Sequence, residues 1–213
     1  MVDTVKKIID PLRQLKWHWS SKLFEYRLDK KFGINTRGKA DIDWNLSSNL
    51  DAVGYAATRY VDLQRIAQYL NLSPDDVFVD YGSGKGRVVL FMSMQKIKKA
   101  IGLEIDPILM RETRKNIKTF EDKYPQHSPV EFIEGEAMDF DPAEGTVFFF
   151  YNPFGEKTFQ KIVNNIERSL QKNPRRILIL YKNAKEKKLL DEASWLTPLG
   201  QIEKTEIFVW RNI

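Results

Sequence analysis

One short segment, VFVDYGSGKGR at positions 77–87, constrains the fold of this chain more than any other. An apolar run of strand character ends in Asp80, and the glycines Gly82, Gly84 and Gly86 follow before an apolar, helix-like run begins. Glycine permits positive φ angles and lets a ligand approach the backbone closely. The first turn of a helix offers free N–H groups to a carboxylate or phosphate. The segment therefore predicts a strand–loop–helix unit that binds an anionic group.

Two common nucleotide-binding loops do not fit this segment. A P-loop requires G-x-x-x-x-G-K-S/T, but Val79 occupies the position of the first glycine and Gly86 that of the hydroxyl residue. A dinucleotide-binding loop requires G-x-G-x-x-G, and Arg87 stands where its third glycine belongs. The pattern that remains is D-x-G-x-G-x-G, in which a carboxylate precedes the glycines.

The chain after residue 75 alternates between short apolar runs and amphipathic runs, which is typical of a parallel sheet covered by helices. Strands are expected at 77–81, 100–105, 130–135, 146–152 and 176–182, and helices at 87–94, 108–124, 157–171 and 184–192. Two final alternating runs, at 195–203 and 205–211, predict an antiparallel hairpin. The sequence therefore predicts an α/β, Rossmann-like fold: a seven-stranded, mostly parallel sheet with helices on both faces.

The N-terminal part has a different pattern. Apolar residues recur at helical spacing over 3–31, where Pro11 interrupts the run, and again over 50–70. The stretch 32–48 shows no periodicity and predicts a boundary. We therefore expect a helical extension at 1–50 and a main domain at 51–213.

Positive charge is concentrated in this extension. Residues 1–40 hold ten Lys and Arg against four Asp and Glu, a net charge of +6, whereas the whole chain carries only +5. One interpretation is an arm that attracts an acidic partner such as nucleic acid. The other is a solvated helix face without a partner. The sequence leaves both open.

Composition excludes several kinds of site. The chain has no cysteine and only two histidines, which excludes disulfides, thiolate metal sites and a cysteine nucleophile. We expect no metal. No apolar run approaches the roughly 18 residues of a membrane helix, and the first residues are too polar for a secretory signal. A cytoplasmic protein without membrane association is the expectation.

The D-x-G-x-G-x-G pattern resembles motif I of the class I (seven-strand) S-adenosylmethionine (SAM) dependent methyltransferases. The resemblance covers about residues 55–213 and implies SAM as cofactor, since SAM carries an ammonium and a carboxylate at one end. Asp80 would bind the ammonium and the loop amides the carboxylate. Gly82, Ser83, Gly84 and Gly86 are the cofactor-binding candidates of this loop.

Two further strand ends fit the same resemblance. IGLEIDP ends the second strand, and Glu104 there would accept both ribose hydroxyls, with Ile105 beside it. GEAMDF ends the third strand, where Glu136 would bind the adenine amino group and Ala137 would pack on the ring. The family usually has Asp in place of this Glu, so Asp139 is the rival. Read without the resemblance, these glutamates are solvated loop acids.

The fourth strand end, YNPFG, resembles the D/N-P-P-Y/F loop of amino-directed methyltransferases with one proline instead of two. The resemblance implies that Asn152 and the Pro153 carbonyl accept hydrogens from the target amine, and that Phe154 or Tyr151 stacks on the target. Asn152 is thus a candidate for both catalysis and the cofactor site. The plain alternative is a turn at Asn152 and Pro153.

Three functions follow from these features. The D-x-G-S-G-x-G-x-V string also resembles seven-strand lysine methyltransferases of the nucleosomal type, so the first hypothesis is an N-methyltransferase of a lysine-like protein side chain or a small amine. The second is a nucleic-acid methyltransferase of the adenine type that contacts phosphates through the basic extension. The third is a non-catalytic SAM-binding sensor or interaction protein. We also expect residues 17–37 to cap the site, with the FGINTRG segment near SAM; the alternative is helices that only cover the sheet.

Overall fold

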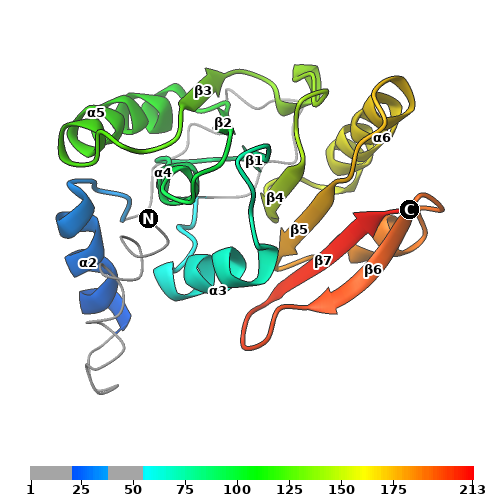
Figure 1. The fold of residues 1–213 in the computed structure, drawn as a ribbon, viewed down its shortest axis with the longest axis horizontal. Helices are drawn as coiled ribbons and strands as arrows, with labels where there is room; N and C mark the ends of the chain where they lie inside the picture. The colour runs from blue at the N-terminus through cyan, green and yellow to red at the C-terminus, as the bar shows by residue number, and fades with distance from the viewer. Residues whose placement is uncertain (1–20, 38–54) are drawn as a thin grey trace.

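A seven-stranded sheet with the order β3-β2-β1-β4-β5-β7-β6 forms the centre of the computed structural model, which describes residues 21–37 and 55–213 (Figure 1). The strands are β1 Val77–Tyr81, β2 Lys99–Glu104, β3 Val130–Glu134, β4 Val147–Tyr151, β5 Leu178–Lys182, β6 Leu196–Gln201 and β7 Ile207–Asn212. The five strands β1 to β5 pair in parallel, whereas β7 pairs antiparallel with both β5 and β6. The predicted fold class is confirmed.

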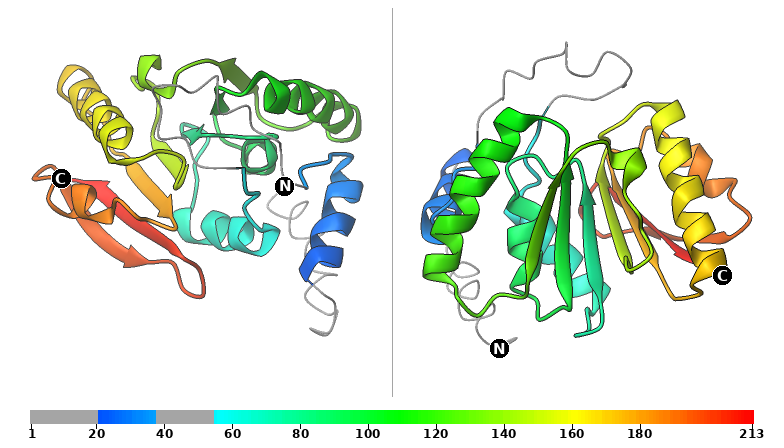
Figure 2. Two further views of the ribbon diagram at one scale, coloured as in Figure 1. Left: turned by 180° about the vertical axis from the view of Figure 1, so that it is seen from behind. Right: turned by 90° about the horizontal axis from the view of Figure 1, so that it is seen from above.

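Helices cover both faces of this sheet. They are α2 Ser21–Phe32, α3 Tyr60–Leu70, α4 Arg87–Ser93, α5 Pro107–Lys123, α6 Glu156–Lys172 and α7 Lys187–Asp191, with a 3₁₀ turn η1 at Ala137–Asp139. Figure 2 shows α2 beside α5, and α6 on the opposite side of the sheet. No helix in these two described ranges is long and apolar enough to cross a membrane.

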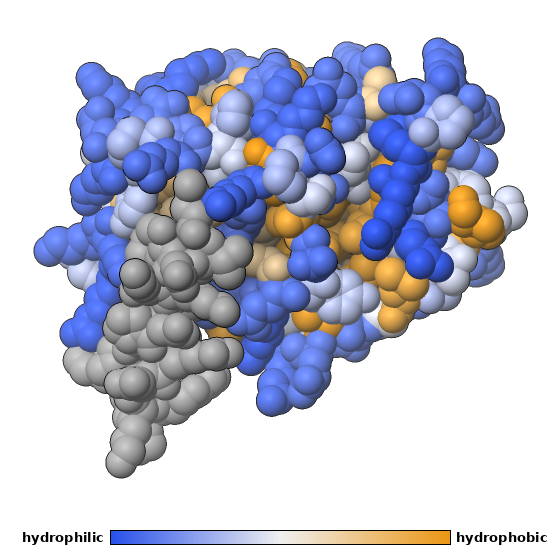
Figure 3. All heavy atoms as spheres, viewed as in Figure 1, coloured by the Kyte–Doolittle hydropathy of each residue, from blue (hydrophilic) through white to orange (hydrophobic). Residues whose placement is uncertain are grey.

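The central strands separate two apolar cores because their side chains alternate between faces. Phe149 of β4 packs in the core that also contains residues of α2, α3, α4 and α5. Its neighbours Phe148 and Phe150 pack on the other face with residues of α6 and α7. All five residues of β1 are buried. The carboxyl end of β1, where the glycine loop begins, is therefore fixed from both faces. In the space-filling view, apolar side chains gather near the middle of the face shown, between hydrophilic rims (Figure 3).

The N-terminal segment 21–37 shares the first of these cores. Leu28 and Phe32 of α2 are 5% and 2% exposed, and the Phe32 ring lies 5.4 Å from that of Tyr60 in α3. The helix expected over 3–31 is thus present from residue 21 onward; its earlier part, Trp17 and Pro11 included, lies outside the described residues. So do 38–54, which hold most of the expected boundary.

One predicted helix begins later than expected. Periodicity placed it at 50–70, but α3 begins at Tyr60 and the residue before it, Arg59, is extended with φ −65° and ψ 143°. The segment 55–58 is not helical because it lies along the glycine loop, where the Tyr55 ring packs against Gly84. A tertiary contact therefore overrides the local helix preference of its two alanines.

Candidate functional site

The glycine loop lies between β1 and α4 and is closely covered. A Cβ atom on Gly84, whose φ is +56°, would lie 2.3 Å from the ring of Tyr55. A Cβ atom on Gly82 would lie 2.9 Å from that of Pro153, which follows β4. The glycines are therefore required both by backbone conformation and by the close approach of two other segments.

The amides of this loop are used inside the protein. The N–H groups of Gly82 and Ser83 both donate to the Leu103 carbonyl, at 2.9 and 2.8 Å, and that of Gly86 donates to the Ser83 carbonyl. The Gly84 N–H donates to a carboxylate oxygen of Glu104 at 2.8 Å. Donors for the carboxylate of a ligand therefore have to come from other groups in the pocket.

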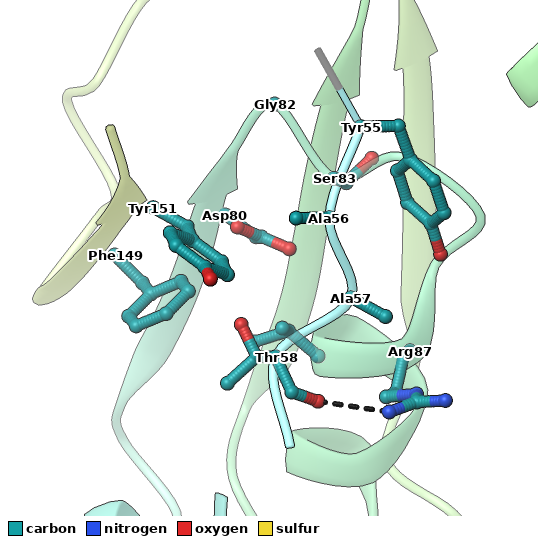
Figure 4. Close-up of a pocket in the computed structure, with 11 residues that line it drawn as sticks. Tyr55, Ala56, Ala57, Thr58, Asp80, Gly82, Ser83, Arg87, Phe149 and Tyr151 are labelled. Carbon is teal, nitrogen blue, oxygen red and sulfur yellow. Dashed lines mark hydrogen bonds between the residues drawn. The ribbon is translucent and has the colours of Figure 1, made fainter. Parts of the chain in front are cut away.

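Asp80 is the buried acid of the site. Its side chain lies between the segment 55–58 and Tyr151 (Figure 4) and is 2% exposed. Burial, and secondly the nearby charge of Glu104, raise the pKa of Asp80 well above that of an ordinary aspartate. No group in the described part of the chain hydrogen-bonds to the Asp80 carboxylate. Such a carboxylate favours a cation as its ligand.

Glu104 lies at the end of β2 with both oxygens occupied. Besides the Gly84 amide, it accepts the backbone N–H groups of Ile105 and Asp106, each at 2.9 Å. It is 8% exposed, and burial raises its pKa although these three amides act in the opposite direction. Glu104 is therefore not a solvated loop acid. It fixes the end of β2 to the glycine loop.

The candidates after β3 lie on η1. Glu136 and Ala137 are half-buried, and Ala137 packs against the core formed with α6. Burial, and secondly Asp139, raise the pKa of Glu136. Asp139 itself is exposed. The structure thus places both rival acids on one short turn, with Glu136 the more enclosed.

Asn152 begins the turn after β4 and points into the protein. Its φ is +44°, it is 2% exposed, and its Oδ1 accepts the hydroxyl of Tyr181 at 3.1 Å. Its Nδ2 is buried and has no hydrogen-bond partner among the described residues. Pro153 packs over Gly82, and Phe154 packs against the core beside α6. In this conformation the three candidate acceptor residues do not line the pocket, whereas Tyr151 does.

A pocket that is partly open to solvent lies at the carboxyl ends of β1 and β4. Its lining combines four consecutive residues before α3 with the glycine loop, the start of α4 and the end of β4: Tyr55, Ala56, Ala57, Thr58, Asp80, Gly82, Ser83, Arg87, Val88, Phe149 and Tyr151. The segment 55–58 was not predicted to line a pocket, because its residues fit the helix expected over 50–70. Arg87 was not predicted to line the pocket either.

Three comparisons identify relatives of this chain. Residues 48–144 match the family model "Histone methylation protein DOT1". A probable ribosomal RNA small subunit methyltransferase A of Methanosarcina barkeri is 29% identical over 108 residues, which are 51% of this chain and 30% of that protein. A protein-lysine N-methyltransferase of Saccharolobus islandicus is 29% identical over 96 residues, which are 45% of this chain and 57% of that protein.

The fold agrees with these matches. The structure of an RNA methyltransferase from Salinibacter ruber, solved in complex with S-adenosyl-L-homocysteine, superposes with a TM-score of 0.51 at 23% identity and covers 73% of this chain and 92% of that one. Over residues 48–144 the sequence, and over most of the chain the fold, thus resemble those of the class I SAM-dependent methyltransferases. The resemblance stated from the sequence is thereby confirmed. The chain spans about a third and somewhat over half of the lengths of the two curated relatives.

The residues of this pocket fit SAM at its polar end. Asp80 supplies a buried carboxylate for an ammonium group, and no residue of 21–37 or 55–213 hydrogen-bonds to it. The hydroxyl of Ser83 is buried, has no hydrogen-bond partner in the described part of the chain and lies in the same pocket. Among residues 21–37 and 55–213, no group of three or more His, Cys, Asp or Glu could hold a metal ion.

Proposed function

We propose that this methyltransferase transfers the methyl group of SAM to nitrogen, on a lysine-like protein side chain or a small amine. The observation that carries the proposal is the buried carboxylate of Asp80, to which no described residue hydrogen-bonds, beside a glycine loop at the carboxyl ends of β1 and β4. Ligands of open α/β sheets bind at this edge. The DOT1 family match and the protein-lysine N-methyltransferase relative support the choice of an amine.

The polar end of SAM would be held by side chains more than by loop amides. Asp80 would bind the ammonium, and Ser83 Oγ would donate to the carboxylate, since the amides of Gly82, Ser83, Gly84 and Gly86 already have acceptors. Glu104 would contact the ribose and Glu136 the adenine. The full set of proposed cofactor contacts is Asp80, Gly82, Ser83, Gly84, Gly86, Glu104, Ile105, Glu136, Ala137 and Asn152.

The protein's part in methyl transfer is alignment. Bound SAM supplies an electrophilic methyl group on its sulfonium, and the acceptor nitrogen must approach it in line with a free lone pair. Tyr151 lines the pocket where such an acceptor would enter, and the Lys182 ammonium lies 4.9 Å from its ring centroid. Asn152, Pro153 and Phe154 remain the proposed catalytic residues. For Asn152 to contact an amine, its amide would have to turn out of the Tyr181 hydrogen bond.

Binding and turnover test this function separately. Calorimetric titration with SAM, and with NAD as the matched nucleotide control, tests the cofactor; tight NAD binding without SAM binding would end the proposal. Incubation with methyl-labelled SAM and a fractionated lysate then asks whether protein or RNA takes the label. SAM binding without any labelled product from protein, RNA or amine fractions would favour the sensor hypothesis.

An RNA acceptor is the second candidate, favoured by one specific observation: the Methanosarcina barkeri relative is named a ribosomal RNA methyltransferase. Phosphate contacts would make acceptor binding fall steeply with salt concentration, whereas a small-amine pocket would show little dependence. Acceptor KM measured between 50 and about 300 mM salt separates the two candidates.

A further inference from the structure

A buried arginine directly behind the glycine loop joins three segments that are far apart in the sequence. Arg87, the first residue of α4, is 4% exposed. Its Nε donates to Thr36 Oγ1 at 2.6 Å, and its Nη1 donates to the Thr58 carbonyl at 3.0 Å, the bond drawn in Figure 4. The guanidinium also forms ion pairs with Glu25 and, at 3.2 Å, with Asp29 of α2. Side-chain and backbone acceptors thus surround it.

The two acids of α2 also hold the start of α3. Glu25 and Asp29 are four residues apart and therefore lie on one face of the helix. Glu25 accepts the backbone N–H of Tyr60 at 3.1 Å, and Asp29 accepts the Tyr60 hydroxyl at 2.7 Å. The Arg87 guanidinium lies 4.4 Å from the Tyr60 ring centroid. One cluster therefore links α2, α3 and α4.

This cluster borders the proposed cofactor pocket. Thr58 ends the segment 55–58 that forms one wall, and Arg87 holds its carbonyl. At the other end of that wall, the Tyr55 hydroxyl donates to the Thr36 carbonyl at 2.5 Å. Thr36 in turn donates to both carboxylate oxygens of Asp29, at 2.9 and 3.0 Å. Both ends of the wall are thus tied to the segment 21–37.

The chemistry of the cluster requires arginine. A guanidinium has five N–H donors in a rigid, planar arrangement, so it can serve a carbonyl, a hydroxyl and two carboxylates at once. A lysine has three donors on one atom and cannot reach all of these acceptors. Burial raises the pKa of Glu25 even though Arg87 acts to lower it. A neutral glutamine is therefore compatible with that position.

We infer that Arg87 is a positioning residue of the methyl-transfer site. It holds the wall at 55–58 in place through Thr58, and it couples that wall to the docked helix α2. Arg87 acts on the wall and not on the reacting atoms, so the consequence is expected in SAM affinity. The inference rests on the proposed function, because it assumes that the pocket binds SAM.

Two variants and one control test this coupling. Arg87→Lys keeps the charge and loses the multi-point contacts; Glu25→Gln keeps the shape and loses the charge on α2. Arg114→Gln is the control, since Arg114 forms a comparable ion pair with Glu134 at 2.7 Å but on the exposed surface of α5. Each is measured by SAM calorimetry, by amide hydrogen exchange at 55–60 and by thermal unfolding.

We expect Arg87→Lys to weaken SAM binding about tenfold and Glu25→Gln about threefold, in protein that is folded at the assay temperature. Amide protection at 55–60 should fall in both without SAM, and the control should match the wild type. If Arg87→Lys does not fold, the SAM affinity and amide protection of Glu25→Gln test the inference. A folded variant with wild-type SAM affinity would overturn the inference and reduce Arg87 to a structural role. Absence of SAM binding in the wild type would instead overturn the proposed function, and the inference with it.

Discussion

Replacing Asp80 by asparagine should change stability and SAM binding in opposite directions. Asp80 is 2% exposed, and burial raises its pKa well above the ordinary value near 4. A raised pKa means that the folded protein holds the proton more tightly than the unfolded chain does. The stability linked to this group is therefore present at low pH and lost as the pH rises through the raised pKa. The folded protein therefore loses stability as the pH rises from the ordinary aspartate range toward the raised pKa of Asp80, and asparagine, which does not ionise, removes this loss.

The magnitudes follow from the surroundings of this carboxylate. A buried polar group without a partner costs about 1–3 kcal/mol, and a charge costs more. We expect Asp80→Asn to raise the free energy of unfolding at pH 7.5 by about 1–3 kcal/mol. At about 2–4 °C per kcal/mol for a chain of this size, the thermal midpoint should rise measurably. A charge-assisted hydrogen bond to the SAM ammonium is worth about 1.5–3 kcal/mol. Its loss should weaken SAM binding about ten- to a hundredfold.

Urea unfolding from pH 5 to 8 and SAM calorimetry give both quantities on the same protein. Asp122→Asn, an exposed acid on α5, is the control and should leave both unchanged. The gap in stability between Asp80→Asn and the wild type should widen as the pH rises. Wild-type SAM affinity should weaken toward acid pH, as Asp80 takes up its proton. If Asp80→Asn binds SAM as tightly as the wild type, Asp80 does not bind the ammonium and the reasoning fails.

Three further perturbations address other parts of the site. Glu104→Ala removes the acceptor of three backbone amides as well as the proposed ribose contact. It should therefore weaken SAM binding about a hundredfold and lower the free energy of unfolding by about 2–4 kcal/mol. Undiminished SAM binding would show that Glu104 does not contact the cofactor. Asn152→Ala should lower the turnover rate and leave the SAM affinity within a few fold of that of the wild type. Tyr181→Phe, which removes the hydrogen bond to Asn152 Oδ1, is measured beside it. An unchanged turnover rate in Asn152→Ala would show that Asn152 is only a turn residue. Deleting residues 1–40 should abolish cooperative unfolding, because the deletion removes Leu28 and Phe32 from the core and the two carboxylates that pair with the buried Arg87. A truncated protein that folds and methylates normally would refute this prediction.

The strands and most helices were predictable because local patterns encode them. The run VFFFY is apolar throughout, and β4 is indeed a central strand buried on both faces. Asp80 and Glu104 could be placed at the same edge of the sheet because the carboxyl ends of parallel strands meet there. Such assignments need only the order of the strands and the position of each residue at a strand end.

The missed features depend on contacts between distant segments. Arg87 was visible in the sequence only as a departure from a dinucleotide-binding pattern, since its partners lie 29, 51, 58 and 62 residues away. The segment 55–58 has the residues of a helix, and only its contact with the glycine loop makes it a wall. The orientation of Asn152 depends in the same way on Tyr181, a residue of the neighbouring strand β5.

The burial of two acids changes how the charge of the N-terminal segment should be interpreted. Residues 1–40 contain four acids, and two of them, Glu25 and Asp29, face inward onto Arg87 and Tyr60. Lys30 and Arg37 of the same segment are exposed. The outer surface of α2 and the loop after it is therefore more positive than the formal charge of its sequence suggests. Such a surface attracts polyanions and repels lysine-rich peptides. Within the proposed function, a target lysine is thus better accommodated in an acidic sequence context than in a basic, histone-like tail.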